Sequence, residues 1–141
     1  MADMLHQIQV QASPDKVYEA LTAQAGLRGW WTADSVAEPT VGSVAEFGFY
    51  NRANLFQLRI DELQPGQHVA WTCLGRPEEW KGTRVVWELA PKDGGADVRF
   101  TQSGWRSTEG GFALVNSTWG ALMFRLKDYL EGRASEPFFP G

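Results

Sequence analysis

TEGGFALVNSTWGALMFRLKDYLEG, residues 108–132, carries the clearest structural pattern in the sequence. Its large apolar side chains recur every three or four residues, which places them on one side of a helix. These side chains are Phe112, Val115, Trp119, Leu122, Met123, Leu126 and Leu130. Ser107 or Thr108 can cap the start of this helix. At 1.5 Å per residue the helix would run for roughly 37 Å, so it must lie across a partner layer.

Short segments of alternating polarity precede this helix, and turn residues separate them, which indicates one antiparallel sheet. The segments are 6–11, 44–50, 56–60, 69–73, 85–89 and 98–102. After the first of them, Ser13 and Pro14 mark the start of a short helix. Residues 27–31 then predict a second helical turn, and a tight Asp-Gly turn lies within 91–95. We expect an α+β fold with a curved antiparallel sheet of about six to seven strands wrapped around the long C-terminal helix.

The composition indicates a single domain, 1–141, with 133–141 as a C-terminal tail. A chain of 141 residues can bury a core without disulfides, and Cys73 is the only cysteine. The 17 acidic and 13 basic residues are mixed along the chain, which argues against nucleic acid as a partner. No apolar run reaches the ~20 residues that span a bilayer, and the N-terminus lacks the pattern of a signal peptide. We therefore expect a cytoplasmic location.

Catalytic and metal-binding patterns are missing from the sequence. His6 and His68 have no histidine, cysteine or carboxylate at ligand spacing, so we expect no metal site. The adjacent Glu78 and Glu79 point apart and predict a solvated loop rather than an acid–base pair. No glycine pair matches a phosphate-binding loop. The sequence thus predicts no cofactor, no metal and no catalytic residue.

Aromatic residues are the unusual feature. Seven Trp and eight Phe are more than a core of this size ordinarily requires, and Trp often marks binding surfaces or cavities. Trp71 and Trp87 project from central strands and fit a core. Four others lie near turns, where they either line the mouth of a cavity or fold back over the core: Trp30, Trp31, Trp80 and Trp105.

Two amides lie on otherwise apolar faces. Gln102 continues the inner face of its strand, and Asn116 lies on the long helix one turn before Gly120. A buried amide without a partner costs roughly 1–3 kcal/mol, so each must meet a protein group, a water or a ligand.

The order of one strand, two short helices, a meander and a long helix resembles the helix-grip fold of the START-like superfamily, also called SRPBCC. Particular motifs resemble its branch of single-domain homologues of the activator of the ninety-kilodalton heat-shock chaperone ATPase. They are 12–21 followed by Trp30 and Trp31, Gly82-Thr83 with 85–89, Ser103-Gly104-Trp105, and 119–130 with Lys127 and Tyr129. That family often carries His where this chain has Gln102. The resemblance implies a cavity between the sheet and the long helix.

The leading functional hypothesis is the binding of a small hydrophobic or aromatic molecule, lipid-like or polyketide-like, in that cavity. Its expected lining is Trp30, Phe47, Phe49, Phe56, Trp71, Trp87, Phe100, Gln102, Trp105, Asn116, Trp119 and Met123. The N-terminal half of the long helix is expected to border the pocket, and its C-terminal half, with Leu122, Leu126 and Leu130, to be plain core.

A second hypothesis is a chaperone-linked or stress-related protein-interaction module that uses a sheet face or the Phe138-Phe139 tail. Those rings could equally fold back on their own domain or pack in a homodimer. A third hypothesis is a cyclase- or hydratase-like enzyme, which needs an acid or base in the cavity. Glu46 and Arg59 are the nearest charged candidates, but they alternate out of the apolar phase, so the sequence favours binding without catalysis.

Overall fold

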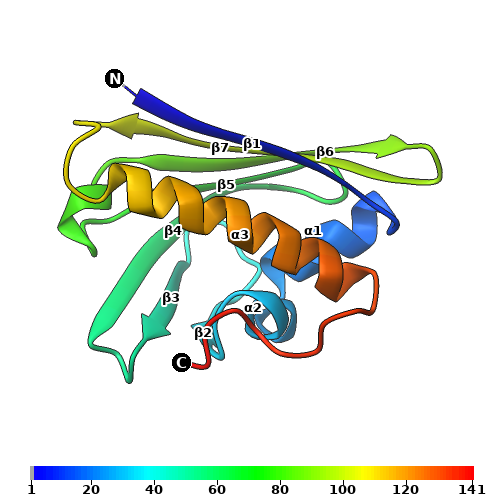
Figure 1. Cartoon of the computed structure of the whole chain (residues 1–141), viewed down its shortest axis with the longest axis horizontal. Coiled ribbons are helices and arrows are strands. Elements are labelled where there is room, and N and C mark those ends of the chain that lie inside the picture. Colours follow the sequence, from blue (N-terminus) through cyan, green and yellow to red (C-terminus); the bar gives the residue numbers. More distant parts are fainter. Residues whose placement is uncertain (1) are drawn as a thin grey trace.

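The computed structural model describes residues 2–141, and within them seven antiparallel strands form one curved sheet (Figure 1). The spatial order of the strands is β1-β7-β6-β5-β4-β3-β2. The strands are β1 (Ala2–Val10), β2 (Asp34–Val36), β3 (Val44–Phe49), β4 (Asn54–Gln64), β5 (His68–Cys73), β6 (Arg84–Lys92) and β7 (Gly95–Trp105). The helices are α1 (Pro14–Thr22), α2 (Gln24–Trp30), the short 3₁₀ turn η1 (Glu78–Trp80) and α3 (Phe112–Leu130).

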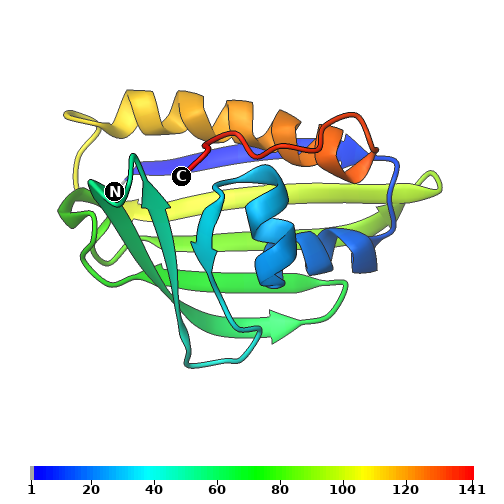
Figure 2. The same ribbon diagram turned by 90° about the horizontal axis from the view of Figure 1, so that it is seen from below.

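Three helices lie on the inner side of the sheet. The long helix α3 runs beside β1, while α1 and α2 cover the opposite end of the same face (Figure 2). This arrangement is the predicted α+β helix grip, so the fold expected from the sequence is confirmed. The later strands form a meander in which β2 to β6 each pair with the next strand along the chain, and β7 pairs with β1. None of the helices in residues 2–141 is long and apolar enough to cross a bilayer.

The start of α1 follows the prediction closely. Ser13 Oγ accepts a hydrogen bond of 3.2 Å from the Lys16 backbone N–H, and Pro14 occupies the first turn. The next helix is fastened to α1 by the Trp30 indole, whose Nε1 donates to the Ala20 carbonyl at 2.8 Å. A Cβ at Gly26 would lie 2.7 Å from Ala20 Cα, so only glycine permits this close approach of α2 to α1.

The predicted start of the long helix is wrong by about one turn. Gly110 has φ +67°, a left-handed conformation, and α3 begins only at Phe112. Ser107 and Thr108 therefore do not cap it; the Ser107 hydroxyl instead accepts from Glu109 N–H at 3.0 Å. A side chain from η1 instead satisfies a free backbone N–H at the start of α3, because Glu79 Oε2 accepts from the Gly111 N–H at 2.8 Å.

Two strand predictions also need correction. The first strand begins at Ala2 rather than at residue 6, and the short strand β2 was not predicted at all. Three residues are too few to show a period, and β2 exists because it pairs with β3 at the sheet edge. The Asp-Gly turn between β6 and β7 is confirmed: Asp93 and Gly94 have φ values of +48° and +80°, as a type I′ hairpin requires.

Candidate ligand-binding site

A cavity of about 330 Å³ lies between the N-terminal half of α3, the β3–β4 hairpin, η1 and the C-terminal segment. Eight aromatic residues line it: Trp31, Phe49, Tyr50, Phe56, Trp80, Trp119, Phe138 and Phe139. Leu114, Val115, Thr118 and Leu122 from α3 and Asn54 from β4 complete the lining. The volume is at the low end of the range of small-molecule sites, about 300–1,000 Å³.

Fixed indole rings form the floor of the cavity. Trp31 stacks on Phe47 with ring centroids 4.2 Å apart, and it contacts Trp119 at 5.2 Å. Phe100 packs against the other side of Trp119 at 4.5 Å. Because both indoles are almost fully buried among other rings, a ligand meets a preformed surface.

A chain of hydrogen bonds holds two walls of the cavity together. The Trp119 indole Nε1 donates to Gln102 Oε1 at 2.9 Å, and Gln102 Nε2 donates to Thr83 Oγ1 at 2.9 Å. The Thr83 hydroxyl in turn donates to the Trp80 carbonyl at 2.6 Å. The Gln102 amide is thus satisfied within the protein and connects Trp119 on α3 to Trp80 on η1.

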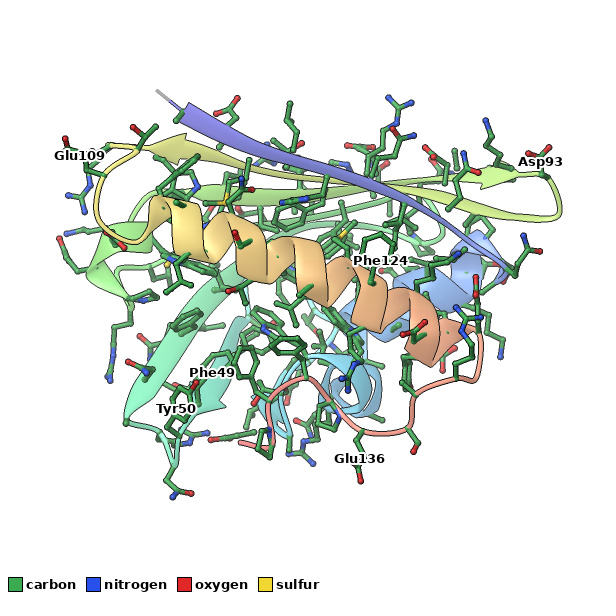
Figure 3. The ribbon with its side chains drawn as sticks, viewed as in Figure 1. Phe49, Tyr50, Asp93, Glu109, Phe124 and Glu136 are labelled. Carbon is green, nitrogen blue, oxygen red and sulfur yellow. The ribbon has the colours of Figure 1, made fainter. Side chains whose placement is uncertain are left out.

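The β3–β4 turn forms part of the rim of the cavity, where the lining residues Tyr50 and Asn54 are exposed. Residues 50–52 all have positive φ, and Tyr50 has φ +55°, an unfavourable conformation for a bulky residue. Figure 3 shows Tyr50 at the end of the hairpin, next to Phe49. The phenol is largely exposed, so Tyr50 and Asn54 place polar groups at the rim of an apolar cavity.

The lining carries no charged side chain. The Thr118 hydroxyl donates to the Leu114 carbonyl at 2.8 Å, so it is satisfied within its own helix. The Arg52 guanidinium lies near the rim but is paired with Asp34 at 2.9 Å. Cys73 is buried outside the cavity, and burial raises the pKa of its thiol, which keeps it protonated and unreactive.

Three of the twelve residues expected at the site line this cavity: Phe49, Phe56 and Trp119. Seven others are packed in the surrounding core: Trp30, Phe47, Trp71, Trp87, Phe100, Trp105 and Met123. Gln102 lies behind Trp119, and the Asn116 Oδ1 is 2.9 Å from His6 Nε2 on β1 rather than in the lining. Of the tryptophans near turns, Trp31 and Trp80 do border the cavity.

Alternation in the sequence identifies the inner face of the sheet, but it does not say which end of that face stays uncovered. Here α1 and α2 cover one end (Figure 2), whereas the cavity is lined by the β3–β4 hairpin, η1 and the N-terminal half of α3. The contributions of Tyr50, Leu114 and Phe139 gave no periodic signal. The Phe138-Phe139 pair was the one hint that the tail returns to an apolar surface.

The two histidines lie outside the cavity. On the sheet surface, His68 is within 2.7 Å of Glu62 and 2.6 Å of Glu88. Partial burial lowers the pKa of His68, but the bonds to the two carboxylates outweigh burial and raise it. Among residues 2–141, no group of three or more His, Cys, Asp or Glu side chains is placed to hold a metal ion.

A curved antiparallel sheet that grips a long C-terminal helix, with a cavity between them, is the architecture of START-like (SRPBCC) proteins. Within this class, the chain belongs to the family described as Activator of Hsp90 ATPase homolog 1-like protein, whose sequence model matches residues 11–131. No curated protein shows significant similarity to the chain.

Solved structures support the same assignment. The chain is similar to the Aha1 dimer from Colwellia psychrerythraea, with 36% identity over 94% of this chain and 98% of that chain, and a TM-score of 0.87. Protein MLL2253 from Mesorhizobium loti shares the fold at 18% identity, covering 93% and 98% of the two chains, with a TM-score of 0.81. An AHSA1-like protein from Aeromonas hydrophila shares it at 15% identity, covering 93% of each chain, with a TM-score of 0.73.

Proposed function

We propose that the protein binds a small, uncharged aromatic or apolar molecule in this cavity. The observation that carries the proposal is the lining, in which rings from five parts of the chain converge on one space of about 330 Å³ without a charged side chain. Flat rings favour offset or edge contacts with a ligand ring, each worth about 0.5–1.5 kcal/mol beyond the area buried. A fatty acid is a poorer fit, because its carboxylate would meet no cation in the lining.

The rim favours a ligand with a polar group at one end. Tyr50 and Asn54 provide a hydroxyl and an amide at the rim, where they can exchange hydrogen bonds with a ligand hydroxyl or carbonyl. An uncharged phenol or a polyketide-like ring system matches this polarity.

Binding without chemistry fits the lining better than catalysis. A general acid or base must lie within hydrogen-bond reach of the reacting group. The Tyr50 phenol is the one titratable side chain in the lining, and it is largely exposed. Glu46 and Arg59 both lie outside the cavity.

Ligand binding is tested with 2-naphthol as the probe and the fluorescence of the wall tryptophans as the signal. We expect quenching that saturates, and a thermal shift that grows with ligand concentration. Thr118→Phe should fill the cavity from α3 and weaken binding at least tenfold. Ser117→Phe is the matched control, since Ser117 is exposed on the same turn and does not line the cavity. Equal binding by both variants would exclude this cavity as the site.

Self-association is a second candidate function, and one surface favours it. Phe124 on the outer side of α3 is 61% exposed, which is unusual for a large apolar residue on a helix that packs against a sheet. Figure 3 shows Phe124 on the face of α3 that points away from the core. The Colwellia relative was solved as a dimer. We propose that a second copy of the chain covers this face.

Light scattering after size exclusion tests the dimer. We expect a dimer for the wild type, a monomer for Phe124→Ser, and a dimer for Leu74→Ser, which removes an exposed apolar residue elsewhere. A wild-type monomer at ~100 μM would refute self-association. Stimulation of an Hsp90-type ATPase by the monomeric variant would instead assign the α3 face to a chaperone.

A further inference from the structure

The C-terminal segment 133–141 leaves α3 and folds back across the end of α2 (Figure 1). Phe138 N–H donates to the Trp30 carbonyl at 3.0 Å, and Phe139 N–H donates to the Trp31 carbonyl at 2.9 Å. Ala33 N–H then donates to the Phe139 carbonyl at 3.1 Å. The segment is thus bound like an added strand, a common mode of peptide recognition.

Its two phenylalanines form one wall of the cavity. The Phe139 ring meets Phe49 edge-on at 4.8 Å and contacts Phe138 at 4.9 Å. On the outer side, Phe138 is 38% exposed, and Arg125 lies 5.7 Å from its ring. Arg125 also donates to the Glu136 carbonyl at 2.7 Å. The backbone of this wall is therefore bound to one short stretch, 30–33, while its side chains contact Phe49 on β3 and Arg125 on α3.

Taking the proposed ligand binding as its basis, we propose that segment 133–141 is a movable wall that sets the length of the ligand. The three backbone bonds all end on residues 30–33, so they can break together without disturbing the sheet. Under the segment, the rings of Trp31 and Phe49 continue the apolar floor. The family model matches residues 11–131, and the segment follows that match.

With the segment in place, the space of about 330 Å³ is at the low end of the range of small-molecule sites, about 300–1,000 Å³, and Phe138 and Phe139 bound it on one side. A longer molecule must displace Phe139, and it will do so only if it binds the displaced state more tightly than the closed one. The wall consequently discriminates by length, while Tyr50 and Asn54 meet the polar end of short and long ligands alike.

A reversible tether tests this directly. A Cβ at Gly141 would lie 3.7 Å from Ala33 Cβ, within the 3.5–4.5 Å of disulfides, so Ala33→Cys with Gly141→Cys can lock the segment. Cys73 is buried and does not compete. Gly141 has φ +110°, which disfavours cysteine, so the reduced form of the same variant is the reference.

Two phenols of different length serve as probes, 2-naphthol and the four-ring estradiol. We expect oxidation to leave the affinity for 2-naphthol within twofold and to weaken that for estradiol at least tenfold, with recovery on reduction. Equal estradiol affinity in both forms, or parallel loss of both probes, would overturn the movable wall. If neither probe binds either form, the proposed binding function itself fails.

Amide exchange in the untethered wild type gives a second test that needs no ligand. The Phe138 and Phe139 amides should exchange at least a hundredfold faster than the Trp119 amide, because the segment opens without global unfolding. Equal protection at these three amides would show that the wall does not move.

Discussion

Replacing Gln102 by leucine should lower the free energy of unfolding, because Gln102 supports the Trp119 wall of the cavity. Gln102 is 0% exposed and accepts from Trp119 Nε1 while it donates to Thr83 Oγ1. The leucine would leave the Trp119 N–H buried without a partner, at about 1–3 kcal/mol, and remove a second bond worth about 0.5–1.5 kcal/mol. Its larger apolar surface offsets about 1 kcal/mol. We therefore expect a net loss of about 2 kcal/mol, or roughly 4–8 °C in Tm.

Urea denaturation followed by tryptophan fluorescence measures this loss. Gln9→Leu is the matched control, because the Gln9 side chain is exposed on β1 and should change stability by less than about 0.5 kcal/mol. Phe at position 119 has no N–H to leave unpaired, so Gln102→Leu combined with Trp119→Phe should cost less than the two single changes added. A Gln102→Leu protein as stable as the wild type, or strictly additive costs, would refute the role assigned to this amide.

Three further predictions concern α3 and its end. Leu126→Ala should cost about 2–5 kcal/mol in urea denaturation, because the side chain is fully buried, whereas an unchanged midpoint would contradict its place in the core. The backbone N–H of Gln11 and the ammonium of Lys127 lower the pKa of Glu131 to about 2. The stability that this low pKa provides is fully present above the unfolded-state pKa near 4.5 and is lost as the pH falls towards 2. Glu131→Gln should therefore reduce the loss of unfolding free energy between pH 4.5 and pH 2. The same loss in the variant and the wild type would contradict this role of Glu131. Asn116→Leu should leave the affinity for 2-naphthol within twofold, since its amide bonds a histidine on β1, and a tenfold loss would place Asn116 in the site.

The sequence predicted the fold well because the fold rests on periodicity. Alternation at 44–50, 69–73 and 85–89 and the three-and-four spacing in α3 each report which face is buried. Local signals failed where the structure depends on distant partners. Ser107 resembled a helix cap, yet the helix entrance is satisfied by Glu79 across the fold.

The cavity was harder to predict than the fold, because a pocket is what packing leaves empty. Trp87 and Phe49 both carry the inner-face signature, but Trp87 is surrounded by other rings, while Phe49 faces the cavity. The difference comes from the position of α1 and α2 and from the return of the tail, which places Phe139 on Phe49. Neither the position of these helices nor the return of the tail can be predicted from the residues of the strand alone.

The indole N–H resonances in a ¹⁵N spectrum can locate the binding site, because the seven tryptophans report on separate parts of the molecule. On titration with 2-naphthol, we predict that the largest saturable shifts occur at the three indoles that line the cavity, Trp31, Trp80 and Trp119. Largest shifts at Trp30 and Trp105, which lie outside the lining, or no saturable shift at any indole, would contradict the cavity as a binding site.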